Sequence, residues 1–303
     1  MYATETMRKV YLIAVLALIA GLGGLVLWYQ HFGAPNRIIA GLIPGTNVRP
    51  AQTLIFAVIG DNEGSNPAYD DLIRQIAADP NIQFLVHVGD ATSTGSATEL
   101  QDLAALHATL GLAVPVYMVL GNHDIKAEDA AQAWSKNVGE RWRSVDIGNV
   151  HLVLLDNANR KVGFPAEELT WLEQDLASLQ TRQPANPVTI LAYHRPFAYP
   201  LADLFGDDET KTSRKSNERF LAILAKYPVQ QIFTGHIHSA LDFTMVTEMD
   251  NTNRATQTVP VTVSGGGGQP IQSAFGSLVK EKFHALRVTV TGQEISMSFI
   301  LPR

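Results

Sequence analysis

The chain has 303 residues, of which 46% are hydrophobic and 17% are charged, and its net charge at pH 7 is −6. This composition excludes a disordered or low-complexity protein, and the acidic balance gives no electrostatic footprint for nucleic acid. The chain has no cysteine, which excludes disulfides, thiolate nucleophiles, iron–sulfur clusters and cysteine zinc sites. Any metal site must therefore use His, Asp, Glu or Asn side chains.

The mean hydropathy of the chain is +0.03, which is high for a water-soluble globular protein, and much of it comes from the N-terminal region. Residues 10–29 form an uncharged run long enough to cross a bilayer, and the run ends in Trp28 and Tyr29, as aromatic residues do at a membrane interface. Arg8 and Lys9 precede it, so the positive-inside rule places residues 1–9 in the cytoplasm. We therefore expect a single-pass membrane protein whose catalytic domain is extracytoplasmic.

A cleaved signal peptide is the alternative interpretation, and it would make the protein secreted. The apolar run is longer than the usual core of a signal peptide, and Leu18 stands where a small residue before Ala20 would favour cleavage. Both features favour an uncleaved transmembrane anchor. Residues 30–52 contain Gly, Pro and Asn and are expected to form a tether, followed by one domain over residues 53–303.

Short β-rich runs alternate with longer amphipathic stretches from the start of this domain to residue 234. The predicted strands are Leu54–Ile59, Phe84–Val88, Val116–Leu120, Val150–Leu155, Val188–Tyr193 and Gln230–Thr234. The predicted helices between them are Asn66–Ala78, Thr98–Leu110, Glu128–Asn137, Ala166–Leu179 and Ser216–Lys226. The polar segment Phe205–Lys215, of mixed charge, is expected to be a solvated loop.

The last third of the chain contains strands without helices between them. They are predicted at Leu241–Thr247, Pro260–Ser264, Ala285–Thr291 and Ile295–Leu301. Alternating strands and helices followed by an antiparallel run predict a mixed α/β sandwich. The four glycines Gly265–Gly268 directly follow one of these strands and form either a turn close to a site or a flexible loop.

Side chains that bind metal ions follow the C-terminal ends of five predicted strands. They are Asp61, Asp90, Asn122 with His123 and Asp124, His194, and His236 with His238. Binding sites in open α/β sheets form beyond the carboxyl ends of the strands, so we expect these side chains to converge. Each one taken singly would more often be a turn or capping residue. Their joint occurrence in this order predicts a metal site, whereas His87, His107, His151 and His284 belong to no motif and are expected to be structural.

These stretches resemble the motifs of the calcineurin-like metallophosphoesterase family over residues 53–268. The matching segments are Gly89-Asp90, Gly121-Asn122-His123-Asp124, His194 and Gly235-His236-Ile237-His238, with Asp61-Asn62-Glu63 at the place of the family's Asp-x-His. The resemblance implies a four-layer α/β/β/α sandwich and a phosphoesterase that acts on phosphate mono- or diesters. It also implies two divalent metal ions, drawn from Mn, Fe, Zn and Mg, which supply a metal-bound hydroxide that attacks phosphorus.

The resemblance implies a role for each matching residue. Asp90 would bridge the two ions. The other ligands would be Asp61, Glu63 and His238 for one ion, and Asn122, His194 and His236 for the other. His123 would protonate the leaving oxygen, and Asp124 would orient the imidazole of His123. Arg195 follows a ligand and is either a phosphate-binding residue or a solvated loop arginine.

Glu63 departs from the family, which has histidine at this position. A glutamate ligand would lower the net charge of the metal centre by one and favour Mn²⁺ or Mg²⁺. Alternatively, Glu63 points away and the chain is a weakened, metallophosphoesterase-fold binding protein. The family implies a phosphorylated small-molecule, lipid-linked or protein substrate, and the N-terminal helix implies contact with the membrane, while no nucleic acid partner is expected.

Overall fold

The computed structural model describes residues 53–182, 187–197, 210–249, 255–270 and 282–303. These residues belong to one compact unit, Pro50–Arg303. The predicted cytoplasmic segment 1–9, anchor 10–29 and tether 30–52 lie outside the described residues. Among the residues that are described, no helix is both long and apolar enough to cross a membrane.

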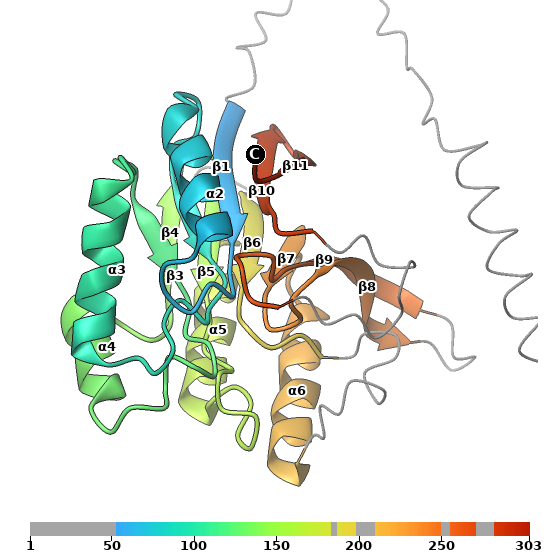
Figure 1. Ribbon diagram of the computed structural model, residues 1–303. Helices are drawn as coiled ribbons and strands as arrows, with labels where there is room; N and C mark the ends of the chain where they lie inside the picture. The colour runs from blue at the N-terminus through green and yellow to red at the C-terminus, as the bar shows by residue number, and fades with distance from the viewer. Residues whose placement is uncertain (1–52, 183–186, 198–209, 250–254, 271–281) are drawn as a thin grey trace, which may run out of the picture. The chain divides into compact units, whose positions relative to one another are not determined.

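Two mixed β-sheets form the centre of this unit (Figure 1). The first sheet has the order β11-β10-β1-β2-β3 and consists of β1 (Thr53–Ile59), β2 (Leu85–His87), β3 (Val116–Met118), β10 (Ala285–Thr291) and β11 (Glu294–Ile300). The second has the order β4-β5-β6-β7-β9-β8 and consists of β4 (Arg143–Ile147), β5 (Val150–Leu154), β6 (Val188–Ala192), β7 (Gln231–Thr234), β8 (Ala240–Met249) and β9 (Ala255–Ser264). The strands β1-β2-β3 and β5-β6-β7-β9 run parallel, so their carboxyl ends lie at common sheet edges.

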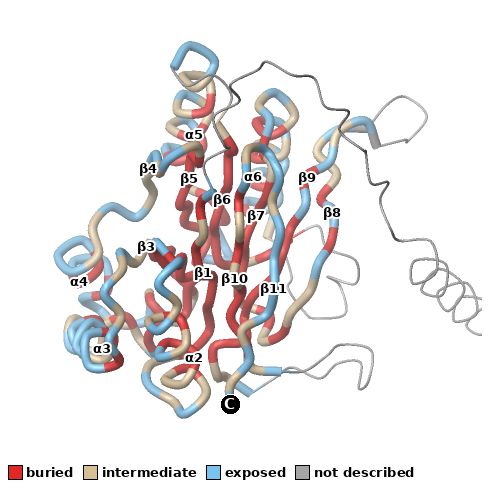
Figure 2. The backbone as a smooth tube through the Cα atoms, turned by 90° about the horizontal axis from the view of Figure 1, so that it is seen from above, coloured by how far each residue is buried: buried red, intermediate tan, exposed pale blue. Residues whose placement is uncertain are grey.

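Helices cover the outer faces of the two sheets. Three hydrophobic clusters hold these layers together, one between each sheet and its helices and one between the two sheets. The first cluster joins the first sheet to α2 (Pro67–Ala78), α3 (Ala97–Thr109) and α4 (Ala130–Asn137). The second joins the other sheet to α5 (Ala166–Ser178) and α6 (Lys211–Leu224). The third lies between the sheets, where Phe56 stacks on Phe84 and meets Phe233 edge-on. The resulting order is helix, sheet, sheet, helix, with the inner strands buried (Figure 2).

Local sequence signals account for the starts of the helices. The Asn66 side chain accepts a hydrogen bond from the backbone N–H of Tyr69, and Pro67 occupies the first turn of α2. A reciprocal capping box between Ser96 and Glu99 starts α3. These caps fix where the loops that follow β1 and β2 end, and those loops carry Asp61, Glu63 and Asp90.

The predicted strands and helices are all present in the described chain, with three differences. β4 was not predicted, because this edge strand is half-exposed and lacks a continuous apolar run. β9 begins at Ala255 rather than at Pro260. The added first part of the strand pairs with β8 in an irregular register.

The third difference concerns the segment that was predicted to be a solvated loop. The helix α6 begins at Lys211 rather than at Ser216, because Thr210 caps it by accepting from the Ser213 N–H. Residues 211–215 are therefore helical, and residues 205–209 lie outside the described chain. A charged, polar turn of helix has no apolar face, so hydrophobic spacing did not reveal it.

Candidate metal centre

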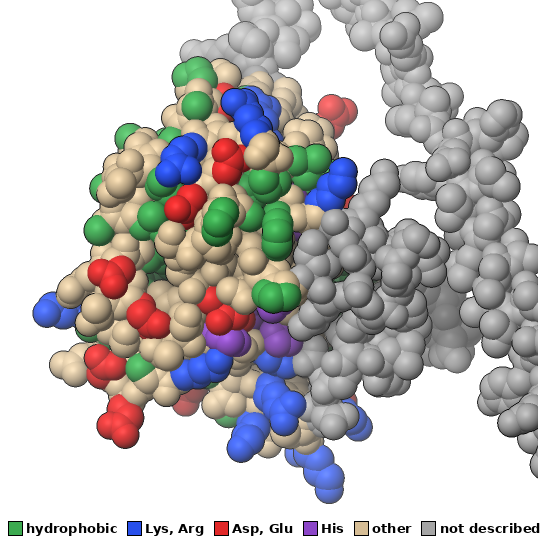
Figure 3. Space-filling view, viewed as in Figure 1, with side chains coloured by type: hydrophobic (Ala, Val, Ile, Leu, Met, Phe, Trp, Pro, Cys, Tyr) green, Lys and Arg blue, Asp and Glu red, His purple; other side chains and the backbone are tan. Residues whose placement is uncertain are grey.

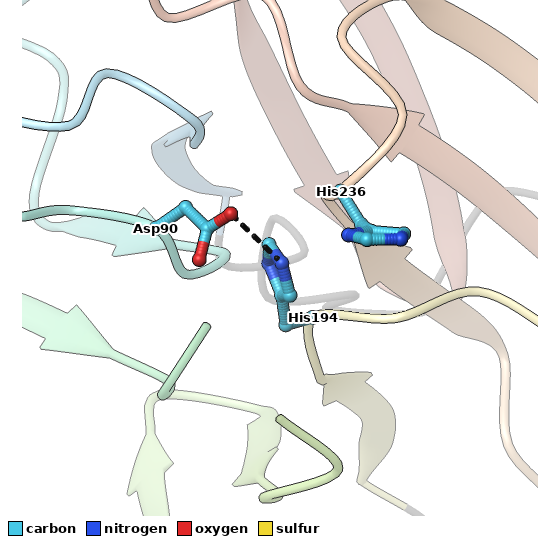
Figure 4. A group of neighbouring side chains, drawn as sticks. All are labelled: Asp90, His194 and His236. Atoms are coloured by element: carbon cyan, nitrogen blue, oxygen red, sulfur yellow. Dashed lines mark ion pairs between the residues drawn. The ribbon is translucent and has the colours of Figure 1, made fainter. Parts of the chain in front are cut away.

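The carboxyl ends of strands from both sheets meet at one place. Asp90 follows β2, His194 follows β6 and His236 follows β7, and each offers a ligand atom within 4.8 Å of the other two. Figure 4 shows the Asp90 carboxylate directed at the His194 ring, with His236 facing the same space. Three residues that are far apart in the sequence thus form a cluster that can hold a metal ion.

Backbone strain is concentrated at the same place. Four non-glycine residues of the described chain adopt left-handed backbone conformations, with φ of 63° at Asp61, 48° at Glu63, 50° at Asp90 and 69° at His236. Each such residue costs on the order of 1–3 kcal/mol, and strain of this kind persists where the surrounding structure enforces it. All four are residues that the strand-end motifs single out.

His194 is held so that one ring nitrogen faces two oxygens. Its Nδ1–H donates to the carbonyl oxygen of Val88 at 2.9 Å, which places the lone pair of the neutral ring on Nε2. That Nε2 lies 3.1 Å from Asn122 Oδ1 and 3.3 Å from Asp90 Oδ2. In the neutral ring, three electron-pair donors face one another, an arrangement that a divalent cation would satisfy.

The electrostatics of the cluster agree with this assignment. Burial lowers the pKa of His194, but the carboxylates of Asp90 and Asp61 outweigh it and raise the pKa to about 9. A positive charge is therefore favoured at this position, supplied by a proton when no metal ion is bound. The donor set, in which carboxylate, amide and imidazole groups converge, fits a divalent metal ion.

Asp61 and His238 form the neighbouring half of the site. Asp61 Oδ1 accepts from the backbone N–H of His236 at 2.8 Å, whereas its buried Oδ2 has no hydrogen-bond partner among the described residues. His238 donates Nδ1–H to the carbonyl oxygen of Pro270 at 3.0 Å and places Nε2 3.7 Å from Asp61 Oδ1. An orphaned buried carboxylate oxygen is costly, and burial raises the pKa of Asp61 well above its usual value. A second cation would relieve this cost.

The Glu63 side chain contacts His123. Its Oε2 lies 2.9 Å from Nδ1 of His123, and Lys126 Nζ lies 2.7 Å from the same ring nitrogen. Histidine side chains are exposed on the face viewed in Figure 3, bordered by acidic and basic side chains. The contact of Lys126 was not predicted, although the residue stands only three positions after His123.

The predicted contact between Asp124 and the His123 ring is wrong. The carboxylate of Asp124 is fully buried and accepts hydrogen bonds from the backbone N–H groups of Ala91, Thr92 and Gly121 and from the Thr92 hydroxyl. Burial and the neighbouring Asp90 raise the pKa of Asp124 to about 6. Asp124 therefore ties together the loops that follow β2 and β3, and Glu63 is the carboxylate beside His123.

A family model described as calcineurin-like phosphoesterase matches residues 54–240, more than half of the chain. The chain belongs to the calcineurin-like phosphoesterase family. The expected membership is thereby confirmed, and the mixed α/β fold with two mixed sheets is that of a metallophosphoesterase.

Two curated plant proteins are similar in sequence. The "Probable inactive purple acid phosphatase 27" of Arabidopsis thaliana is 25% identical over 198 residues, covering 58% of this chain and 31% of the relative. The "Probable inactive purple acid phosphatase 24" of the same plant is 23% identical over 295 residues, covering 84% of this chain and 46% of the relative. The chain thus spans less than half the length of either relative.

A solved purple acid phosphatase from yellow lupin (Lupinus luteus) seeds has a similar fold. It superposes with a TM-score of 0.61 at 19% sequence identity, covering 83% of this chain and 52% of that chain. This likeness concerns the fold.

Arg195 of this calcineurin-like phosphoesterase contacts one of the candidate metal ligands, Asn122. Its Nη1 donates to Asn122 Oδ1 at 3.2 Å, so the arginine is not simply a solvated loop residue. Asn157 holds its backbone on both sides, donating Nδ2–H to the Arg195 carbonyl at 2.7 Å and accepting from the Arg195 N–H at 2.9 Å. Asn157 was not predicted, although it follows a strand end in the same way as the metal-ligand candidates.

The glycine run Gly265–Gly268 forms a turn against the site. Gly267 donates its N–H to the carbonyl of Gly60 at 2.8 Å, and the N–H of Gln269 donates to the carbonyl of Asp61 at 3.2 Å. A Cβ at Gly267 would overlap the Gly60 carbonyl, so this close approach of two backbones requires glycine. Of the two interpretations of this run, the turn close to the site is the one observed.

Proposed function

We propose that this protein is a metal-dependent phosphoesterase that hydrolyses phosphate mono- or diesters. The observation that carries the proposal is the convergence of His194 Nε2, Asn122 Oδ1 and Asp90 Oδ2, while Nδ1 of His194 is committed to the Val88 carbonyl. Together with His236, these residues would hold one ion, and Asp61 and His238 would hold a second beside the shared Asp90. Bound Mn, Fe, Zn or Mg ions supply Lewis-acid stabilisation of phosphoryl oxygens and lower the pKa of water.

The other site residues would bind and orient the substrate. The backbone N–H of His123 donates to Asp90 Oδ1 at 2.7 Å, so the ring is carried on the same frame as the metal ligands. Its partly exposed imidazole is placed to give a proton to the leaving oxygen. The planar guanidinium of Arg195, held by Asn157, would pair with a phosphate oxygen.

We propose further that residues 10–29 anchor the protein in a membrane with the catalytic domain outside the cytoplasm. The uncharged run and the preceding Arg8 and Lys9 support this orientation. The substrate would then be a phosphorylated small molecule, a lipid-linked phosphate or a phosphoprotein, and secretion after signal-peptide cleavage is the alternative. N-terminal sequencing of the mature protein together with carbonate extraction of membranes separates the two.

A binding protein on the same fold is the second candidate. Two observations favour it: Glu63 contacts His123 instead of a metal-ligand candidate, and both curated relatives carry the word "inactive" in their names. This candidate retains the fold but not the hydrolysis of phosphate esters.

Metal analysis and a substrate panel distinguish the two candidates. We expect protein purified without chelator to contain divalent metal and to hydrolyse at least one of a phosphate monoester, a diester and a pyrophosphate when supplied with Mn²⁺, Fe²⁺, Zn²⁺ or Mg²⁺. The Asp90→Asn variant is the control, and it should lose both properties. Absence of metal and of activity under all four conditions would exclude the phosphoesterase.

A further inference from the structure

His87 is the last residue of β2, three positions before Asp90, and it belongs to none of the strand-end motifs. Its side chain is fully buried beside α2, where its ring meets the Tyr69 ring edge-on. Its Nε2 lies 2.7 Å from Oδ1 of Asn62, the residue that follows Asp61. A buried histidine of β2 thus contacts the loop after β1, which carries a metal-ligand candidate.

The amide group of Asn62 shows the direction of this hydrogen bond. Its Nδ2 donates to the carbonyl oxygens of Gly64 at 2.9 Å and of Ala91 at 3.1 Å, and both of these atoms can only accept. The amide oxygen therefore faces His87, which donates its Nε2–H. Burial lowers the pKa of His87 to about 3, so the ring is neutral and its lone pair lies on Nδ1.

Asn62 joins three segments around the metal centre. Its side chain connects its own loop, through Gly64, to the loop after β2, through Ala91. Its backbone carbonyl accepts from the side chain of Gln269 at 3.1 Å, in the segment that follows the glycine run. Asn62 is buried, so these bonds are shielded from competing water. The Nε2–H of His87 is the donor that satisfies the buried amide oxygen of Asn62.

The backbone on both sides of Asn62 needs such support. Asp61 and Glu63 flank it in left-handed conformations, with φ of 63° and 48°. Conformations of this kind persist where the surrounding structure enforces them. Without the His87 proton, the amide oxygen of Asn62 would be buried and unpaired, which favours a rearrangement of the loop. The loop that holds Asp61 therefore depends on a side chain outside the set of candidate ligands.

We propose that His87 is a positioning residue of the metal centre, which holds Asn62 and through it sets the separation of the Asp61 and Asp90 carboxylates. The inference rests on the proposed function, because bound metal ions are what makes this separation matter. Two ions that share Asp90 require Asp61 at a defined distance from it. Residues that orient metal ligands from outside the ligand set change metal affinity by about 10- to 100-fold.

Equilibrium dialysis of the full chain against Mn²⁺ tests the role of His87 without measuring activity. The His87→Leu variant removes the N–H donor but keeps a buried side chain of moderate size. We expect the Mn²⁺ concentration at half-saturation to rise by about 10- to 100-fold. The His87→Gln variant retains an N–H donor near the position of Nε2, and its half-saturation should stay within about threefold of the wild type.

The matched control is His107→Leu. His107 is also buried, burial lowers its pKa to about 4, and its Nε2 lies 2.7 Å from the hydroxyl of Tyr69 on α2. This variant loses a comparable buried hydrogen bond, but the partner is on a helix and not in a loop with metal-ligand candidates. The free energy of unfolding should fall, while Mn²⁺ half-saturation stays within about threefold. Equal weakening of Mn²⁺ binding by His87→Leu and His107→Leu, or no rescue by His87→Gln, would overturn the inference.

The route through Asn62 is tested by combining variants. Asn62→Ala alone should weaken Mn²⁺ binding as His87→Leu does, and adding His87→Leu to it should change half-saturation by less than about threefold. A full further loss in the double variant would mean that His87 does not act through Asn62. If His87→Leu does not fold, Asn62→Ala carries the test, and wild-type Mn²⁺ binding by Asn62→Ala would overturn the inference.

Failure of the proposed function can be recognised separately. If the wild type binds no Mn²⁺, the metal centre fails, and amide hydrogen exchange of the metal-free protein still measures the positioning. The N–H groups of Glu63 and Gly64 donate across the two loops to the carbonyls of Asp90 and Ala91. Their protection should fall by at least about tenfold in His87→Leu and by less than about threefold in the control variant. Unchanged protection in His87→Leu would overturn the inference.

Discussion

His194 and His151 are both buried beside carboxylates, yet the fold holds them in opposite ways. His151, on β5, contacts Asp146 of β4 through Nδ1 and Asp175 of α5 through Nε2, the latter at 2.8 Å. Both of its ring nitrogens are satisfied, and no electron pair remains for a metal ion. His194 instead uses one nitrogen on a backbone carbonyl and directs the other at two oxygens.

The difference shows what separates a metal site from a structural ion pair. Histidine and carboxylate side chains are close together in both clusters, so composition and burial alone do not distinguish them. The deciding feature is the backbone bond from His194 to Val88, which leaves Nε2 available to an ion. The motif around His194, and the lack of one around His151, points to the same distinction from the sequence.

The largest expected effect is at His194. The His194→Gln variant keeps the approximate volume of the side chain but removes the imidazole nitrogen that faces Asp90. We expect kcat/KM to fall by at least about 10³-fold, because Lewis-acid catalysis contributes several kcal/mol to transition-state stabilisation. Steady-state kinetics and metal analysis on the same preparation measure this. Unchanged metal content in the folded variant would contradict the assignment of His194.

His151 should give the opposite result. The His151→Gln variant removes the short ion pair of the buried Asp175 carboxylate and leaves it only the longer one to Arg182 at 3.8 Å. We expect the free energy of unfolding to fall by about 3 kcal/mol at pH 6. Below the unfolding transition, kcat/KM should remain within about threefold of the wild type. Urea titration and kinetics check both halves. A large loss of activity with little loss of stability would break the comparison.

A smaller effect on activity is expected at Asn157, which lies beside the candidate metal ligands through Arg195. The Asn157→Ala variant removes the two hydrogen bonds that hold the Arg195 backbone. We expect kcat/KM to fall by about tenfold, since these bonds contribute about 1.4 kcal/mol to positioning, and the change should be mainly in KM. An Arg195→Ala variant should show a larger rise in KM. If Asn157→Ala changes kcat alone, Arg195 does not bind substrate phosphate.

The smallest effect is a pH dependence that only His151 should produce. Burial lowers the pKa of His151, but the hydrogen bonds to Asp175 and Asp146 outweigh it and raise the pKa above its usual value. The folded protein then binds this proton more tightly than the unfolded chain does. The stabilisation is fully present below about pH 6.5 and is lost as the pH rises through the folded-state pKa, by at most about 1.4 kcal/mol per pH unit.

The measurement is the difference in unfolding free energy between the wild type and His151→Gln from pH 5 to pH 9. The difference is needed because buried His87 has the opposite dependence: burial lowers its pKa to about 3, so its contribution is lost as the pH falls below about 6.5. The difference should narrow toward high pH. A difference that widens would mean that His151 is neutral in the folded state.

Much of the site was predictable because strand ends are predictable. Apolar runs of strand length locate Asp61, Asp90 and His194, and parallel strands bring their carboxyl ends together. The partner of Asp124 was not predictable, because it depends on the backbone N–H groups that the Thr92 loop presents in space. The left-handed backbone of Glu63 was not predictable either, because the sequence has a non-glycine residue at this position.

The fold shows the same division. The buried strands and amphipathic helices follow from hydrophobic spacing, whereas the half-exposed edge strand β4 and the polar first turn of α6 have no such pattern. The parallel pairing of β9 with β7 also depends on contacts between strands that are not consecutive in the sequence.

The sequence by itself determined the order of the elements, the family and the placement of ligand-type side chains at strand ends, because these depend on local periodicity and short motifs. The tertiary structure alone decided which partner each polar side chain takes. Hydrogen bonds and ion pairs depend on separations of about 3 Å, and packing between the two sheets sets those separations. His194, Asp124 and Glu63 all lie in loops that follow strand ends. Their spatial neighbours alone make His194 a metal-ligand candidate, Asp124 a link between two loops and Glu63 a neighbour of His123.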